Sequence, residues 1–182
     1  WLSEQLGRNP REVQTLQTWW IKLRENSITQ VPAQFYVARR EAQSQELINA
    51  FQEYQNAKPV SVSSTDARDV LAFVYAALQT HSNLLERTLI VTDQTAWDHL
   101  VEFKTSLLLI PRFNNPDTAS ALARGHRVLM VIDGESRSKD TDTIALPKVG
   151  RHEAAEVLRK AGIDFRQAER TTVLARRSMG AF

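Results

Sequence analysis

Residues 107–134 read LLLIPRFNNPDTASALARGHRVLMVIDG, and this stretch decides the fold class. It begins with an apolar run, Leu107 to Ile110, and ends with a second apolar run, Val128 to Ile132. Between the two runs, Asp117 to Ala123 predicts a short helix that Gly125 closes. Apolar runs that do not alternate with polar residues, and that are separated by a helix, are typical of parallel strands covered on both faces. The unit therefore predicts an α/β fold.

The same alternation of strands and helices extends in both directions from this unit. Further strands are expected at 35–38, 59–63, 88–91 and 143–147, and further helices at 40–54, from a cap at Thr65 or Asp66 to Leu78, and around Trp97. Consecutive parallel strands are joined by right-handed crossovers. We therefore expect an open, mostly parallel sheet of about five strands with helices on both faces.

The composition is that of a globular domain. The chain has 182 residues, a formal net charge of +2 and no cysteine. A chain of this length can bury one substantial core. The lack of cysteine excludes disulfides, thiol nucleophiles and thiolate metal sites. No apolar run approaches the roughly 20 residues that a bilayer requires, so we expect a cytoplasmic protein without membrane contact.

The first thirty residues predict a helical arm. Asn9 followed by Pro10 is typical of a helix start. Apolar side chains then recur at helical spacing as far as Leu23, and they include Trp19 and Trp20. We expect this tryptophan pair to pack on the core or on another domain rather than to stack on a ligand.

The ends of the chain suggest its context. The chain begins at Trp1, and its two methionines are Met130 and Met179. We therefore expect a segment of a longer polypeptide. The expected partners are the other domains of that polypeptide, and a homo-oligomer stays open as an alternative.

One motif near the start of the predicted core resembles a known family. Arg40-Glu41-Ala42 with Glu46-Leu47 resembles the arginine–glutamate motif that precedes the phosphate loop in STAND and AAA+ P-loop NTPases. A strand at Val60–Ser64 and a helix that includes Val70–Ala72 follow in the order found in those families. The resemblance covers roughly residues 35–182 and implies a P-loop-NTPase-like core over 31–147 and a helical lid over 148–182, within a bacterial signalling or antiviral defence protein. The helical arm over 1–30 precedes this core.

The resemblance does not extend to the phosphate loop. A P-loop needs glycines that let the backbone approach phosphate and a lysine that reaches the terminal phosphates. The four diagnostic positions instead hold Val62, Ala67, Arg68 and Asp69. The strand that should end in a Walker B carboxylate is followed by Pro111-Arg112. We therefore expect no cofactor, no catalysis, and a scaffold or relay role through protein contacts, with a vestigial phosphate loop at Ser63, Ser64, Thr65 and Arg68.

Two carboxylates keep an enzymatic alternative open. Asp93 and Asp133 each follow an apolar strand directly. Ligands of open parallel sheets collect at the carboxyl ends of the strands, so this pair could hold magnesium in a metal-dependent phosphodiesterase or nuclease. Alternatively, each aspartate caps the helix or turn that follows it.

The predicted lid offers a third function. Basic residues outnumber acidic ones over 151–182, and they include Arg151, Arg176 and Arg177. Such an excess is typical of nucleic-acid binding. Acidic residues at helical spacing would instead make it a solvated helix face.

The histidines do not predict a metal site. The chain has four of them, and their spacing fits no metal-ligand pattern. His126 follows Gly125 at the start of a predicted strand. We expect it to pack or to form hydrogen bonds.

Overall fold

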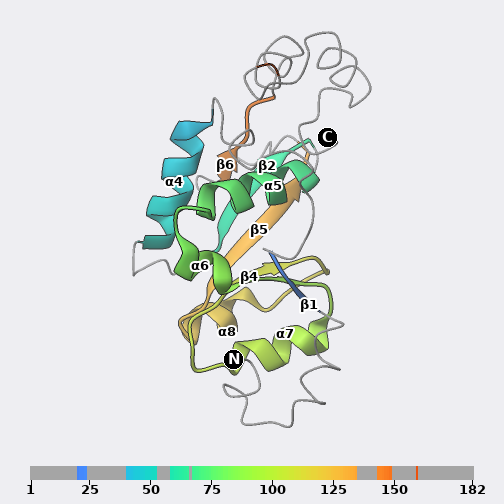
Figure 1. The fold of residues 1–182 in the computed structure, drawn as a ribbon. Coiled ribbons are helices and arrows are strands. Elements are labelled where there is room, and N and C mark those ends of the chain that lie inside the picture. Colours follow the sequence, from blue (N-terminus) through green and yellow to red (C-terminus); the bar gives the residue numbers. More distant parts are fainter. Residues whose placement is uncertain are drawn as a thin grey trace.

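The computed structural model describes residues 20–23, 40–52, 58–65, 67–134, 143–148 and 159. The strands are β1 (Trp20–Lys22), β2 (Val60–Ser64), β3 (Thr88–Val91), β4 (Leu108–Pro111), β5 (Arg127–Asp133) and β6 (Thr143–Ala145). The helices are α4 (Glu41–Gln52), α5 (Ala67–Leu78), α6 (Ser82–Glu86), α7 (Gln94–Val101) and α8 (Thr118–Ala123) (Figure 1).

The strands form one six-stranded sheet in the order β1-β3-β4-β5-β2-β6. Every neighbouring pair is parallel except β1 and β3, which are antiparallel. β2 and β5 align over their whole common length, from Val60 opposite Leu129 to Ser64 opposite Asp133. The predicted α/β class and the mostly parallel sheet are therefore confirmed.

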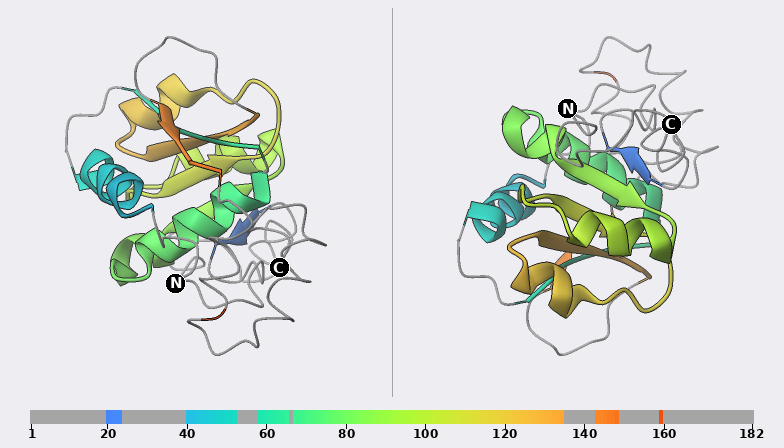
Figure 2. Two further views of the ribbon diagram at one scale, coloured as in Figure 1. Left: turned by 90° about the horizontal axis from the view of Figure 1, so that it is seen from above. Right: turned by 90° about the horizontal axis from the view of Figure 1, so that it is seen from below.

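Helices cover both faces of the sheet (Figure 2). On one face, Ile90, Leu108 and Leu129 pack in a cluster with buried residues of α4, α5 and α6. On the other face, Leu89 and Leu109 pack in a second cluster with buried residues of α7 and α8. Neighbouring residues of one strand thus face opposite sides, and both sides are apolar, which explains why these strands are apolar without alternation.

Two helices begin where aspartate side chains cap them. Asp93 accepts hydrogen bonds from the N–H groups of Thr95 (2.8 Å) and Ala96 (3.4 Å) at the start of α7. Asp117 accepts one from the N–H of Ser120 (3.1 Å) at the start of α8. These side chains satisfy N–H groups that have no partner within the helix.

The structure corrects the sequence prediction at Trp20. We expected residues up to Leu23 to continue a helix, but Trp20–Lys22 form β1, with Ile21 opposite Ile90 of β3. Leu23 follows the strand, is fully buried, and its N–H donates to the carbonyl of Thr88 (3.0 Å). Without β1, one edge of β3 would expose its N–H and C=O groups, so this pairing outweighs the local helical spacing.

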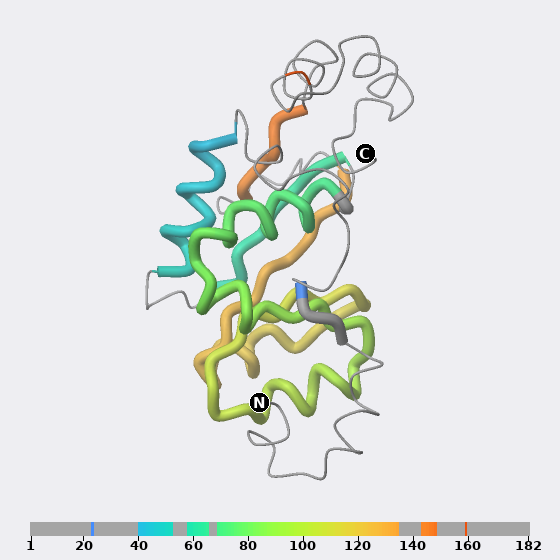
Figure 3. The backbone as a smooth tube through the Cα atoms, in the orientation of Figure 1, coloured from blue at the N-terminus to red at the C-terminus, as the bar shows by residue number. Residues whose placement is uncertain are grey.

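Segments far apart in the chain meet at the opposite end of the sheet. α4 lies next to β6, although the rest of the core separates them in the sequence (Figure 3). β6 pairs with β2 through Val62 opposite Ile144. The beginning and the end of the described core are therefore neighbours in space.

Several predictions concern residues outside those that the structure describes. They are the rest of the helical arm with Trp19, the strand at 35–38, and the lid with Arg151, Arg176 and Arg177. Arg159, the described residue of the predicted lid, is helical and exposed. Among the described residues, no helix has the length and apolarity needed to cross a membrane.

Candidate functional site

The predicted phosphate-loop position is a tight turn between β2 and α5. β2 ends at Ser64 and α5 begins at Ala67, so only residues 65 and 66 lie between them. Val62, at the first glycine position of a P-loop, lies inside the strand and is fully buried. A P-loop forms a wide, glycine-rich cradle of N–H groups around phosphate, and this turn is too short to form one.

A buried ion pair fills the space beside this turn. The Nη1 and Nη2 atoms of Arg40 donate to Oδ1 and Oδ2 of Asp69, both at 2.8 Å. Arg40 is 2% exposed and Asp69 is 4% exposed. Two parallel hydrogen bonds between a guanidinium and a carboxylate are the strongest arrangement of such a pair. The charge of Asp69 is therefore matched inside the protein.

Two further contacts join this pair to the sheet and to the end of the core. The Ser64 hydroxyl donates to Oδ2 of Asp69 at 2.9 Å. Nη2 of Arg40 also donates to the carbonyl of Pro147 at 3.0 Å, across 107 residues of sequence. The contacts join four segments: the residue before α4, the end of β2, the first turn of α5, and the chain after β6. We call Arg40, Ser64, Asp69 and Pro147 the junction cluster.

The remaining residues of the predicted phosphate loop lie in the strand, in the turn and at the start of the helix. Ser63 lies in β2, is buried, and its carbonyl accepts from the N–H of Leu146 (2.9 Å). Thr65 is exposed in the turn. Arg68 lies in the first turn of α5, and its side chain is outside the described part of the structure.

The structure does not bring Asp93 and Asp133 together. Asp93 follows β3 and Asp133 ends β5, and β4 lies between these two strands. Two strand spacings of roughly 4.8 Å therefore separate them, whereas carboxylates that share one magnesium ion bind it at roughly 2.1 Å. Asp93 caps α7, as the second interpretation of the sequence expected. No group of three or more histidines, aspartates or glutamates that could hold a metal occurs among the described residues.

The position of a Walker B carboxylate is also occupied by other residues. β4 ends at Pro111, which is buried, and Arg112 follows it and is exposed. The N–H of Arg112 donates to the carbonyl of Val91 at 2.7 Å, which continues the pairing of β3 with β4. Among the described residues, no carboxylate therefore stands at the end of β4 in the Walker B position.

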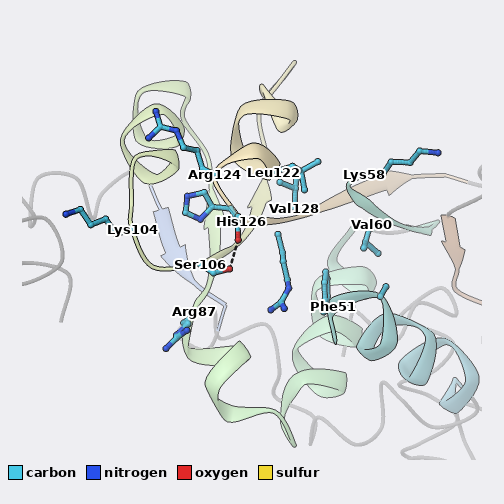
Figure 4. A pocket seen from close by; sticks show the side chains of 13 residues that line it. Phe51, Lys58, Val60, Arg87, Lys104, Ser106, Leu122, Arg124, His126 and Val128 are labelled. Carbon is cyan, nitrogen blue, oxygen red and sulfur yellow. Dashed lines mark hydrogen bonds between the residues drawn. The ribbon is translucent and has the colours of Figure 1, made fainter. Parts of the chain in front are cut away.

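A second site lies at the opposite, amino edge of the sheet, and the sequence did not predict it. A cleft of about 510 Å³ opens there between the start of β5, the end of α4 and the end of α8 (Figure 4). Its charged lining residues are all basic: Lys58, Arg87, Lys104, Arg124 and Arg127. They lie in the loops that lead into strands or at the first residue of a strand. The basic residues were visible in the sequence, but only the strand order shows that they lie together.

His126 lines this cleft and connects two of the segments around it through hydrogen bonds. Its Nδ1 accepts from the N–H of Leu107 at 3.2 Å, so the ring proton is on Nε2, which donates to the carbonyl of Val101 at 2.9 Å. The ring thereby joins the end of α7 to the start of β4. Burial lowers the pKa of His126 below its ordinary value, and nearby Arg124 lowers it further, against the opposing effect of the hydrogen bond to Val101. The hydrogen-bonding role that the sequence predicted is confirmed.

Comparisons with known proteins place this chain in no family. No protein-family model matches it, and no curated protein is significantly similar to it.

Proposed function

We propose that this chain is a catalytically inactive scaffold or relay module of the STAND and AAA+ type, which acts through contacts with other domains of its polypeptide in a signalling or defence protein. The observation that supports this most directly is the buried Arg40–Asp69 pair. It lies at the junction of β2 and α5, where the resemblance to P-loop NTPases puts the vestigial phosphate loop. A further anion there would have to displace Asp69 from its arginine.

The second support is the place of the junction cluster in the chain. Arg40 directly precedes α4, the first helix of the described core, and Pro147 follows β6, its last strand. One guanidinium group bonds to both Asp69 and Pro147. The segments that lead into and out of the core are therefore joined through one buried arginine, which is the geometry that a relay between flanking segments requires.

Calorimetry with nucleotides tests the absence of catalysis. Titration of the 182-residue chain with ATP, ADP and GTP in the presence of magnesium should give no binding heat, because the turn between β2 and α5 has no phosphate cradle. Binding at micromolar concentration accompanied by hydrolysis would contradict the proposal.

Hydrogen exchange tests the relay. Arg40→Lys keeps the charge but cannot bond both oxygens of Asp69 and the carbonyl of Pro147 in the same way. We expect faster exchange of the Leu146 amide, which bonds to β2 beside the cluster. The matched control is Arg112→Lys, because Arg112 is exposed at the same edge and should leave that exchange unchanged. Equal exchange in both variants would argue against the coupling.

A further inference from the structure

Two clefts form one groove along the amino edge of the sheet. The second cleft, of about 520 Å³, lies beside the ends of α4 and α5 and includes Thr80 and His81. It shares Phe51, Arg87, Ser106 and Arg127 with the first cleft. We call the two clefts together the amino-edge groove. It is distinct from the junction cluster, which lies at the carboxyl edge.

The groove carries an excess of positive charge. Of its five basic residues, Arg124 binds the exposed Glu102 at 2.8 Å. Arg87, Lys104 and Arg127 form no ion pair with any residue that the structure describes. Among the residues that the structure describes, no acidic side chain lines either cleft. Most of this charge is therefore not balanced within the described part of the fold.

Helix ends explain only part of this excess. α8 and α6 end at the groove, and Arg124 and Arg87 occupy their C-cap positions. A cation at such a position favourably offsets the partial negative charge of the helix end. Lys104 lies in the loop before β4, and Arg127 is the first residue of β5, so neither cation has this function.

The arrangement of the cations favours a polymer over a small ligand. A small phosphate compound needs several donors that converge on one point. In Figure 4 the side chains of Lys58, Lys104 and Arg124 point to different sides of the cleft. A dispersed set of cations gains affinity when it displaces counterions from a densely and evenly charged chain.

The floor of the groove indicates how such a chain would be recognised. Phe51 is the one phenylalanine, tyrosine or tryptophan among the described lining residues, and it is 1% exposed. Val60 and Val128 are buried as well. Among the described residues of the groove, bases would therefore find no exposed phenylalanine, tyrosine or tryptophan ring to stack on, although stacking platforms are the usual means of holding single-stranded bases. Contacts would be limited to phosphates, which carry no sequence information.

We propose that the amino-edge groove binds nucleic acid through its phosphate backbone, without recognition of sequence. An acidic protein segment offers the same charge but spaces its carboxylates unevenly on flexible side chains. Because the cations of the groove do not converge on one point, a regular array of phosphates matches them better than such a segment does. His126 supports the site by fixing the start of β4 and the loop that carries Lys104.

Fluorescence anisotropy tests the proposal. Labelled duplex DNA, single-stranded DNA and RNA of unrelated sequences should bind the 182-residue chain at low salt with similar affinities. Affinity should fall steeply as salt rises. Absence of binding at low salt, or a strong preference for one sequence, would overturn the proposal.

Paired variants locate the binding site. Arg87→Gln with Arg127→Gln should weaken binding roughly tenfold and lower the salt slope by the equivalent of about two phosphate contacts, each about 0.7 to 0.9. The matched control is Arg112→Gln with Lys148→Gln, which removes the same charge at the carboxyl edge and should change binding little. Equal losses in the two double variants would show a general charge effect and overturn the groove assignment. Unchanged binding in the first would also overturn it.

Two further measurements keep this result interpretable. Thermal unfolding should show that both double variants are folded, because Arg87, Arg112 and Lys148 are exposed. If the first double variant is unfolded, Lys104→Gln with Arg124→Gln replaces it. A poly-glutamate peptide that competes as effectively as DNA would favour an acidic protein partner and contradict the nucleic-acid assignment. These outcomes are independent of the nucleotide titration at the other edge.

Discussion

Arg40 and Asp69, separated by 29 residues of sequence, form two parallel hydrogen bonds of 2.8 Å inside the core. Removing one partner of a buried ion pair leaves the other charge without compensation in a medium of low polarity. The pair therefore controls stability at the carboxyl edge. It is also the observation on which the proposed scaffold function chiefly rests.

Neutralising Asp69 should strongly destabilise the protein. We expect Asp69→Asn to lower the free energy of unfolding by about 3 to 5 kcal/mol, because the buried Arg40 loses its counter-charge. The matched control is Glu102→Gln, which breaks the exposed pair with Arg124 and should cost at most about 1 kcal/mol. Urea denaturation measures both values. Similar losses in the two variants would show that burial does not govern the energy of these pairs.

Removing both charges should be tolerated far better than removing one. In Arg40→Met with Asp69→Leu, the buried charges are replaced by apolar groups of similar size, and such replacements are often neutral or stabilising by about 1 to 4 kcal/mol. The loss of the Pro147 and Ser64 contacts works against this gain. We expect the double variant to be more stable in urea than Asp69→Asn. A double variant that is less stable would argue that the pair is needed for folding itself.

Stability should fall in mild acid because of His126. Its pKa is lowered in the folded state, so the unfolded chain binds the proton more readily. The cost is absent above the ordinary histidine pKa of about 6.5 and grows as pH falls below it, until the folded state also takes up the proton. We expect denaturant midpoints to decrease between about pH 7 and pH 5, because a protonated ring can no longer accept from Leu107.

Substitution of His126 isolates this effect. Glutamine has both a donor and an acceptor but does not titrate, so His126→Gln should reduce the slope of stability against pH over that range. His81→Gln serves as a control at a partly exposed histidine. If the slope of stability against pH is unchanged in His126→Gln and reduced in His81→Gln, the pH dependence is not due to His126.

The two strand-end aspartates should behave differently from each other. Asp93→Ala removes the cap of α7 and should cost about 1 kcal/mol in the free energy of unfolding. Asp133 is exposed at the end of β5, and Asp133→Ala should change stability by at most about 0.5 kcal/mol. Thermal unfolding with and without magnesium provides the check. A magnesium-dependent rise in melting temperature that both variants abolish would revive a shared metal site.

The sequence predicted the strands well because their signal is local. β3 and β4 are buried at every position, so their apolar runs do not alternate and resemble no surface element. β1 was missed because its identity depends on a partner: Ile21 lies opposite Ile90, far along the chain. The spacing of the apolar residues before Leu23 also fits a helix, so it cannot distinguish a helix from an edge strand there.

The two sites needed information that spacing does not contain. Arg40 and Asp69 were both singled out in the sequence, but in separate roles, because nothing local indicates that they meet. The amino-edge groove depends on the strand order, which places β5 between β4 and β2. Only that order brings Arg127 close to Arg87, which precedes β3.

The contact between Arg40 and Pro147 also has a mechanical consequence. A pull applied directly between residues 40 and 147 would load the hydrogen bond of this arginine to the Pro147 carbonyl at once. The sheet would be carried along as a rigid body while the load passes through one guanidinium group. The number of bonds at that point, and not the strength of the core, would then set the force at which the module yields.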